Sequence, residues 1–169
     1  MPVSPDELLH HLESLGIATT TVEHPELHTV EDSQKLRGDI AGAHSKNLFV
    51  KDKKSRLFLI VTLEDAALDL KSIHQAIGAQ GRVSFGSAEL LEEVWGVRPG
   101  SVTPFGAIND TEGRVTVVLD AQLMAHATLN FHPLVNTRTT SIAAADLLTF
   151  LDAARHPPLV AALPRQMPG

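Results

Sequence analysis

The sequence predicts an α+β fold with a mixed, largely antiparallel β-sheet flanked by helices. Three observations predict it: strand-like and helix-like segments are interleaved without a regular βαβ period, hairpin signals are prominent, and 169 residues suffice for one ordinary core. An apolar fraction of 43% is typical of a globular protein. We therefore expect a single domain over residues 1–155, followed by a loosely held Pro-rich tail over residues 156–169.

The N-terminal elements are predicted by capping and propensity signals. A helix should begin after Ser4, which can form a capping box with Glu7, and should end at Gly16. Residues 18–23 are rich in β-branched side chains, which favour a strand. A second, short helix is expected over residues 30–37.

The later elements are predicted by the same kinds of signal. Two apolar runs, 43–52 and 56–63, flank the polar turn 53–55 and predict a β-hairpin. Residues 96–106 contain five glycines and prolines and should form a loop with unusual backbone angles. The remaining predicted elements are helices over 69–77, 87–95 and 144–154 and strands over 83–85, 114–120, 127–133 and 139–143.

Missing residue types and motifs exclude several kinds of chemistry. A chain without cysteine has no disulfide, thiolate nucleophile, Cys-ligated zinc or iron–sulfur cluster. The sequence has no phosphate-binding glycine motif, no G-x-S-x-G elbow and no H-E-x-x-H pair. His24 and His28 have i,i+4 spacing, but Pro25 lies between them and no third ligand follows at a telling distance. We therefore predict no metal site.

The ends and the hydropathy of the chain indicate a cytoplasmic protein. No apolar run reaches the roughly 18 residues that a membrane helix needs. The N-terminus has no basic region followed by an apolar stretch, so we expect no secretory signal and no membrane contact.

Charge is distributed unevenly along the chain. The net charge of −6 and the lack of a recognition-helix motif argue against binding to duplex DNA. Residues 35–56, however, contain seven basic and two acidic residues, a local charge of +5. This pattern is compatible with a solvated hairpin or with contact to a small polyanion such as the end of an RNA. The seven basic residues are Lys35, Arg37, Lys46, Lys51, Lys53, Lys54 and Arg56.

Three segments place polar or conformationally unusual residues beside apolar ones. Lys46 and Asn47 enter an apolar strand, where the lysine either snorkels to solvent or meets an anion. The loop 99–106 either cradles a ligand with its main chain or is a structural crossover. His132 and Asn136 surround a proline turn, where the histidine either orients a substrate or serves the structure.

Three motifs together carry a resemblance to a known family. SKNLFVKD, GVRPGSVTPFGAIND and NFHPLVNTRTTSIAAADLLTFL occur in this order. They resemble the YbaK/prolyl-tRNA synthetase-associated editing domain family, most nearly its freestanding ProXp-ala type, over about residues 5–155. The resemblance implies a barrel-like mixed sheet and hydrolysis of the ester in misacylated tRNA, with alanine on proline tRNA as the substrate of this type. It also implies no metal or organic cofactor.

The resemblance also implies which residues form the site. Lys46 matches the functional lysine of the family, Gly106 the loop around the aminoacyl group, and His132 the histidine of the F-H-P-L motif. The proposed partners are the acceptor end of proline tRNA and, transiently, prolyl-tRNA synthetase. Substrate contacts are expected from Asn47, Ser101, Val102, Thr103, Pro104, Phe105 and Asn136. Contacts to tRNA are expected from Lys35, Arg37, Lys51, Lys53 and Lys54.

Such a reaction requires mainly positioning and charge stabilisation, because an aminoacyl ester is already activated. Lys46 should neutralise the terminal phosphate or ribose end, and N–H groups near Gly106 should polarise the carbonyl. The neighbouring ribose hydroxyl of the substrate should help to activate water. A pocket too small for proline would select alanine. Its apolar wall is expected from Leu48, Ile60, Phe105 and Leu129.

Two other functions remain open at this stage. A related deacylase could remove cysteine from proline tRNA, although family members of that kind generally lack the H-P-L-x-N-T pattern found here. A module that binds tRNA or a synthetase without turnover is the alternative from another class.

Overall fold

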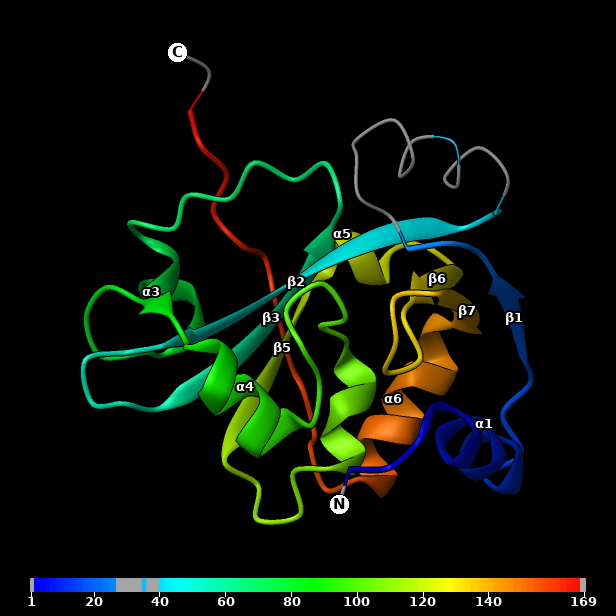
Figure 1. Ribbon diagram of the computed structural model, residues 1–169. Helices are drawn as coiled ribbons and strands as arrows, with labels where there is room; N and C mark the ends of the chain where they lie inside the picture. The colour runs from blue at the N-terminus through cyan, green and yellow to red at the C-terminus, as the bar shows by residue number, and fades with distance from the viewer. Residues whose placement is uncertain (1, 27–34, 36–39, 168–169) are drawn as a thin grey trace.

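The computed structural model describes residues 2–26, 35 and 40–167, and its centre is an eight-stranded mixed sheet (Figure 1). The strands are β1 (Thr19–Glu23), β2 (Ala43–Lys51), β3 (Leu57–Leu63), β4 (Ser84–Phe85), β5 (Val115–Asp120), β6 (Thr128–Phe131), β7 (Arg138–Ala143) and β8 (Leu159–Ala161). Their order is β1-β7-β6-β2-β3-β5-β8, and β4 pairs with β2. Four of the pairings between described strands are antiparallel and three are parallel. The predicted α+β fold with a mixed sheet is confirmed.

Helices flank this sheet. They are α1 (Pro5–Ser14), α3 (Ile73–Ile77), α4 (Ala88–Trp95), the 3₁₀ helix η1 (Pro104–Ile108), α5 (Ala121–Met124) and α6 (Ala144–Ala153). The capping box that begins α1 is confirmed, since Ser4 and Glu7 exchange hydrogen bonds at 3.0 and 3.1 Å. At α4, the hydroxyl of Ser87 accepts from the N–H of Leu90 at 3.1 Å, as its capping position predicts.

Two apolar cores lie on opposite sides of β2 and β3. The larger core joins the sheet to α1, α4 and α6, which lie in the lower half of Figure 1, and contains Leu12, Trp95 and Phe150. The smaller core joins the other face to α3 through Ile60 and Ile73. Because side chains alternate between faces along a strand, neighbouring residues of β2 lie on opposite sides of the sheet.

Strand β2 joins the β1-β7-β6 part of the sheet to the part that contains β3, β4, β5 and β8. At its start, Ala43 and His44 pair in parallel with β6. The rest of the strand pairs antiparallel with β3 as a hairpin, and its last two residues also pair with β4. The polar turn of this hairpin is confirmed, and Ser55 adopts a left-handed conformation in it.

Several element boundaries differ from the predictions. The helix expected from residue 69 begins at Ile73, because the carboxylate of Asp69 instead accepts from the Lys71 N–H and the Ser72 hydroxyl and closes a turn. The expected loop 96–106 ends in the 3₁₀ helix η1. The sequence also did not predict the short helix α5. The helix expected over 30–37 lies outside the described residues, apart from the exposed Lys35.

The prediction of a loosely held tail is wrong for residues 156–167. Strand β8 pairs in parallel with β5, and Leu163 is buried in the smaller core. His156 is also buried, and its ring lies 2.9 Å from a carboxylate oxygen of Asp110. The prolines of this segment limit hydrogen bonding but do not prevent it from adding an edge strand.

Candidate active site

A polar pocket of about 230 Å³ lies where β2 begins. Residues from β2, β6 and β7 and from the loops that follow β3, α4 and β6 form its wall. These residues are His44, Ser45, Asn47, Glu64, Gly100, Asn130, Phe131, His132, Asn136 and Thr139. Three of the predicted site residues, Asn47, His132 and Asn136, therefore come together in one pocket.

Asn130 holds the two sides of this pocket together. Its amide donates to the carbonyls of Ala41 and Ala43 at 3.0 and 3.2 Å. Its side-chain oxygen accepts from Ser141, while its main-chain carbonyl accepts from the Ser45 hydroxyl at 2.9 Å. Since both ends of the amide are engaged, Asn130 fixes β2 against β6 and β7 rather than offering groups to a ligand.

Burial of His132 favours the neutral form of its imidazole. Its Nδ1 lies 2.9 Å from the carbonyl of Arg138, which requires an N–H at Nδ1 and leaves Nε2 as the acceptor nitrogen. Burial is the main cause that lowers its pKa below 6.5; His24 lowers this pKa further, and the hydrogen bond to the Arg138 carbonyl opposes both effects. His24 is itself fixed by a contact of 2.8 Å between its Nε2 and the hydroxyl of Thr139.

Asn47 offers an unused acceptor. Its Oδ1 atom is buried and has no hydrogen-bond partner among the described residues. A buried amide oxygen without a partner is costly unless something in the pocket donates to it. Asn47 lies in the pocket wall, so a donor on a ligand is the natural partner.

Lys46 lies in β2 between two residues of the pocket wall, Ser45 and Asn47, but does not line the pocket itself. Its side chain is half-buried, and Nζ donates to the carbonyl of Ala66 at 2.5 Å. Ala66 follows β3 in the same segment as Glu64, which does lie in the pocket wall. The ammonium is therefore held by a segment that borders the pocket and is not free in bulk solvent.

The 96–106 loop contributes a different glycine from the one expected. Gly100, with a φ of +93°, lies in the pocket wall near the amide of Asn136. Ser101 borders a second hollow of about 410 Å³, and Asn136 lies in the walls of both. The positive φ at Gly100 favours glycine and allows the main chain to turn against the 134–137 turn.

Residues 102–106 serve the core. Thr103, Phe105 and Gly106 are buried, Pro104 begins η1, and Val102 packs against the larger core. The indole N–H of Trp95 donates to the carbonyl of Thr103 at 2.7 Å. A Cβ on Gly106 would lie 2.1 Å from the Trp95 ring, so only glycine fits there. None of these residues lines the pocket, and the substrate roles predicted for them remain predictions.

The apolar residues expected to form the pocket wall do not line this pocket. Phe105 and Leu129 belong to the larger core, Ile60 belongs to the smaller core, and Leu48 packs against the smaller core. The apolar residue in the pocket wall is Phe131, which stacks edge-on against Phe105 with the ring centroids 5.8 Å apart. Phe105 thus supports the pocket from behind.

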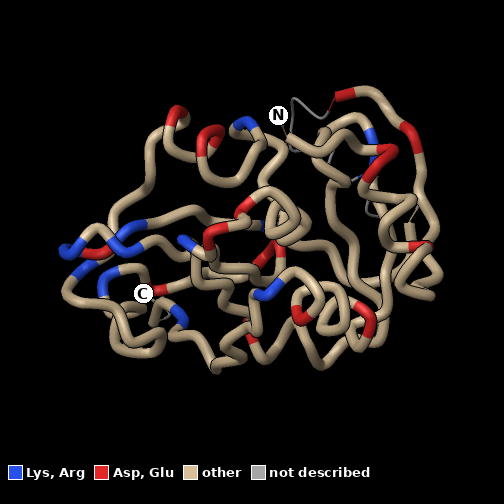
Figure 2. The backbone as a smooth tube through the Cα atoms, turned by 90° about the horizontal axis from the view of Figure 1, so that it is seen from below, with Lys and Arg blue, Asp and Glu red and all other residues tan. Residues whose placement is uncertain are grey.

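Lysines and arginines gather at the far end of the β2–β3 hairpin (Figure 2). Lys51, Lys53 and Lys54 are exposed there, whereas Arg37 lies outside the described residues. The segment before β4 contacts the hairpin turn: the Lys53 N–H donates to the carbonyl of Gln80 at 2.9 Å. Arg82, in the same segment, is exposed. Phe85, which pairs with Val50 across the β2–β4 ladder, is 60% exposed.

Some residues of the pocket wall and of the hairpin end could not be identified from the sequence. Ser45, Glu64 and Thr139 reach the pocket only because β2 pairs with both β3 and β6. Phe85 carries a signal that was available, an aromatic residue in a polar stretch, but its exposure depends on its position at the sheet edge.

No group of three or more His, Asp or Glu side chains among the described residues is arranged to bind a metal ion. No helix in the part of the chain that the structure describes combines the length and the hydropathy needed to cross a bilayer.

Comparison with known proteins places this fold and pocket in a family. The model of the aminoacyl-tRNA editing domain matches residues 24–150. The chain is 40% identical over 156 residues to prolyl-tRNA synthetase associated domain-containing protein 1 of Danio rerio, covering 91% of this chain and 84% of that protein. It is 34% identical over 137 residues to the prolyl-tRNA editing protein ProX of Acetoanaerobium sticklandii, covering 80% and 83%.

A solved structure shows the same fold. The crystal structure described as that of a putative trans-editing enzyme for prolyl tRNA synthetase superposes with a TM-score of 0.72 at 19% identity, over 98% of this chain and 100% of that one. The family model covers well over half of the sequence, and its description agrees with the motifs around Lys46 and His132. The chain belongs to the YbaK-like aminoacyl-tRNA editing domain family.

Proposed function

We propose that this protein is a trans-editing deacylase that hydrolyses the ester of misacylated tRNA, with alanyl-tRNA(Pro) as its substrate. The observation that carries the proposal is the pocket in which a neutral His132 and the unpartnered oxygen of Asn47 lie beside the strand position of Lys46. Membership of the editing family and the name of the ProX relative support the same reaction class.

Lys46 binds the terminal phosphate or ribose end of the substrate. In the free protein its ammonium donates to the Ala66 carbonyl, which is a neutral acceptor. A phosphate oxygen makes a stronger, charge-assisted hydrogen bond with an ammonium. The half-buried position of Lys46 reduces screening by solvent and makes this interaction sensitive to placement.

The reaction adds water to the carbonyl carbon and breaks the bond between that carbon and the ribose oxygen. The ribose oxygen leaves as a hydroxyl with a proton that originates from the water, and the amino acid leaves as a carboxylate. The neighbouring ribose hydroxyl assists the water. The Nε2 atom of His132 accepts a hydrogen bond from that hydroxyl, because Nδ1 is already engaged with Arg138.

The loop contributes main chain rather than side chains. Gly100 lies in the pocket wall, so we place the contact to the substrate carbonyl there. Gly106 supports this contact indirectly, because its close approach to Trp95 fixes the loop, and Trp95 in turn binds the Thr103 carbonyl. Asn47 accepts a hydrogen bond from a donor of the aminoacyl group or the ribose.

Selection of alanine follows from size. A synthetase site built for proline discriminates against a smaller side chain by only about 1–3 kcal/mol per methylene, so a second pocket has to remove the error. A pocket of about 230 Å³ that must also admit the ribose leaves little space beside Phe131. Small side chains fit there, and the ring of proline is excluded. Cysteine is the nearest competitor in size.

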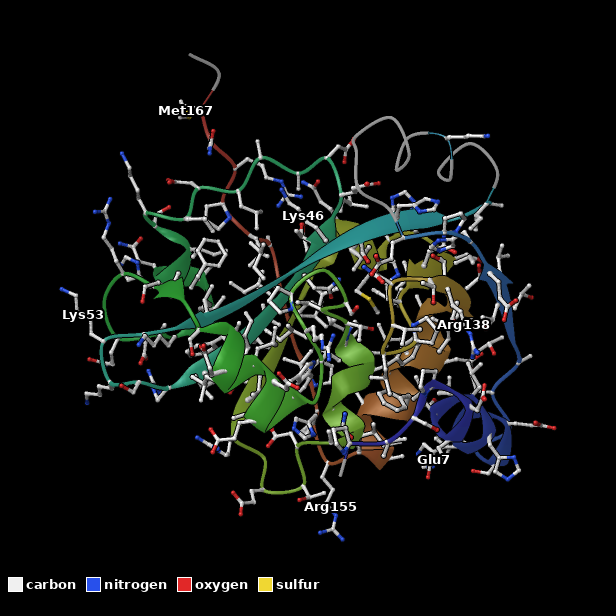
Figure 3. The ribbon with its side chains drawn as sticks, viewed as in Figure 1. Glu7, Lys46, Lys53, Arg138, Arg155 and Met167 are labelled. Atoms are coloured by element: carbon white, nitrogen blue, oxygen red, sulfur yellow. The ribbon has the colours of Figure 1, made fainter. Side chains whose placement is uncertain are left out.

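The hairpin end forms the RNA contact. Lys51, Lys53 and Lys54 supply positive charge for the acceptor-stem backbone. The exposed Phe85 offers a flat apolar face on which a base can stack. The position of Lys53 at the hairpin tip, well away from Lys46, suits an RNA that enters along β2 (Figure 3).

The decisive experiment measures ester loss from three substrates. The pure protein is incubated with alanyl-, cysteinyl- and prolyl-tRNA(Pro), and the remaining ester is followed with time. Rapid loss of alanine alone supports the proposal. Preferential loss of cysteine would identify cysteinyl-tRNA(Pro) as the substrate and leave the proposed reaction class unchanged. No loss from any of them refutes the deacylase and favours a binding module.

A substitution at Lys46 tests the mechanism. We expect Lys46→Ala to reduce the single-turnover rate by about 10²–10³-fold, the range seen when one stabilising donor is removed from an active site. The matched control is Lys71→Ala, which removes an exposed lysine from the turn before α3. Thermal melting of both variants should resemble that of the parent protein. A Lys46→Ala variant with parental turnover contradicts the assigned role.

A further inference from the structure

The C-terminal segment is hydrogen-bonded to the segment that holds Lys46. Next to Ala66, the carbonyl of Ala67 accepts from the N–H of Gln166 at 2.8 Å. The Asp69 N–H donates to the Pro164 carbonyl at 2.9 Å, and Leu68 forms an antiparallel bridge with Arg165. In Figure 1 the red C-terminal segment crosses the segment after β3 where these contacts lie.

A series of side-chain hydrogen bonds links the C-terminal segment to the residue of β3 that pairs with Lys46. The guanidinium of Arg165 donates to Asp120 at 2.7 Å, to Gln122 at 2.8 Å and to the carbonyl of Leu163 at 3.0 Å. The same carboxylate oxygen of Asp120 accepts from the hydroxyl of Thr62 at 2.6 Å. Both Asp120 and Thr62 are fully buried.

Thr62 is the direct partner of Lys46 across the β2–β3 ladder. Residues directly opposite in an antiparallel pair place their side chains on the same face, with Cβ atoms about 4.5–5.5 Å apart. The lysine is thus bordered by two groups that depend on the C-terminal segment. One is the Ala66 carbonyl at its ammonium, and the other is Thr62 beside its stem.

We propose that Arg165 is a positioning residue for Lys46, acting through Asp120 and Thr62 on one side and through residues 66–69 on the other. This inference rests on the proposed function, in which Lys46 must meet the substrate phosphate or ribose. An ammonium on a flexible four-carbon stem is useful to a reaction only when its neighbours restrict its position. The C-terminal segment, which the sequence predicted to be loosely held, supplies that restriction.

Loss of Arg165 should make both neighbours of Lys46, the Ala66 carbonyl and Thr62, less firmly held. Asp120 is buried and would be left without its cationic partner, which disturbs Thr62 and the β5–β8 edge. The hydrogen bonds that join Gln166 and the Pro164 carbonyl to residues 67–69 would weaken with it. The ammonium of Lys46 would then sample more positions and become more accessible to solvent.

The test compares three full-length variants by hydrogen exchange and by kinetics. Arg165→Ala removes the guanidinium, Arg165→Lys keeps the charge without the fork, and Arg114→Ala removes an exposed arginine elsewhere as the control. We expect faster exchange in residues 64–72 and faster acetylation of Lys46 by acetic anhydride in Arg165→Ala, with the β1–β7 pair unchanged. Arg165→Lys should fall between this variant and the parent.

The kinetics should show that the Lys46 ammonium is misplaced, rather than that tRNA binding is lost. For Arg165→Ala we expect a single-turnover rate about 10–100-fold lower, as for a small displacement of a reacting group, with unchanged affinity for uncharged tRNA. Should this variant fail to fold, the double substitution Asp120→Asn with Arg165→Met removes both charges, so no buried carboxylate is left unpaired. The same shifts in exchange and acetylation are expected from it.

The outcomes separate the inference from the function on which it rests. Unchanged exchange and acetylation at residues 64–72 and Lys46 overturn the positioning role, whatever happens to the rate. Faster exchange and acetylation in a protein whose parent form cleaves no aminoacyl-tRNA support the mechanical link and refute the deacylase. Both shifts together with the slower rate support the inference as stated.

Discussion

Gly106 shows at the scale of a single residue how close packing can resemble a functional signal. It belongs to a glycine- and proline-rich loop, which the sequence indicated to be either a main-chain binding site for a ligand or a structural crossover. In the structure its Cα faces the five-membered ring of Trp95, and a Cβ there would lie 2.1 Å from Nε1. Gly100, six residues earlier, has the pocket position instead.

The substitution Gly106→Ala should therefore act on stability. We expect a loss of about 1–3 kcal/mol in the free energy of unfolding, because the new methyl group forces the indole to move. The cost should be smaller in a Trp95→Ala background, since alanine lacks the indole ring that the new Cβ would meet. Denaturant unfolding of the two single variants and the double variant measures this coupling. Additive losses would contradict the packing explanation.

The β2–β3 hairpin is the element in which local chemistry is best defined. The carboxylate of Asp52 accepts from the N–H groups of Lys54, Arg56 and Gln80, each at 2.9 Å. It also pairs with the Arg56 guanidinium at 2.9 Å. Burial alone raises the pKa of Asp52, but these donors outweigh it and lower the pKa from 3.8 to about 2. The acid thus fixes a turn crowded with lysines.

This shift predicts how the stability of the hairpin depends on pH. The folded pKa lies below the ordinary value, so the ionised carboxylate stabilises the fold above about pH 4, and this contribution is lost as the pH falls towards about 2. Asp52→Asn should lower the melting temperature at pH 7, and its difference from the parent protein should shrink between pH 4 and pH 2. Calorimetry across this range measures it. A constant difference would show that the charge of Asp52 does not stabilise the turn.

At the scale of the whole molecule, basic residues are concentrated at one end. The chain carries −6 overall, while the exposed Lys51, Lys53 and Lys54 lie together at the hairpin end (Figure 2). An acidic body with one basic end restricts contact to a short stretch of a polyanion. This arrangement suits the end of a tRNA better than an extended nucleic acid.

The salt dependence of tRNA binding should therefore reflect only a few phosphate contacts. The slope of log K against log salt changes by about 0.7–0.9 for each phosphate contact removed, so Lys53→Ala should reduce its magnitude by about one unit. The control is Arg155→Asn, which lies well away from Lys53 and where asparagine tolerates the local φ of 61° (Figure 3). Equal slopes for the Lys53 variant and the parent protein would place the RNA elsewhere.

Local signals in the sequence were enough for most elements and for several site residues. The capping box at Ser4 and the N-cap at Ser87 were predictable because their donors and acceptors lie three residues apart. Asn47 and His132 were predicted as site residues and do meet in one pocket. The motifs that carry the family resemblance are also local.

The tertiary structure decided everything that depends on which strands pair. The sequence by itself determined the α+β composition, the basic hairpin and the family, because these follow from short-range patterns. Only the fold determined that Gly100 rather than Gly106 borders the pocket, that its wall is polar, and that residues 159–166 support Lys46. Parallel pairing of β5 with β8 and of β2 with β6 joins residues far apart in the chain, and no local pattern encodes such a contact.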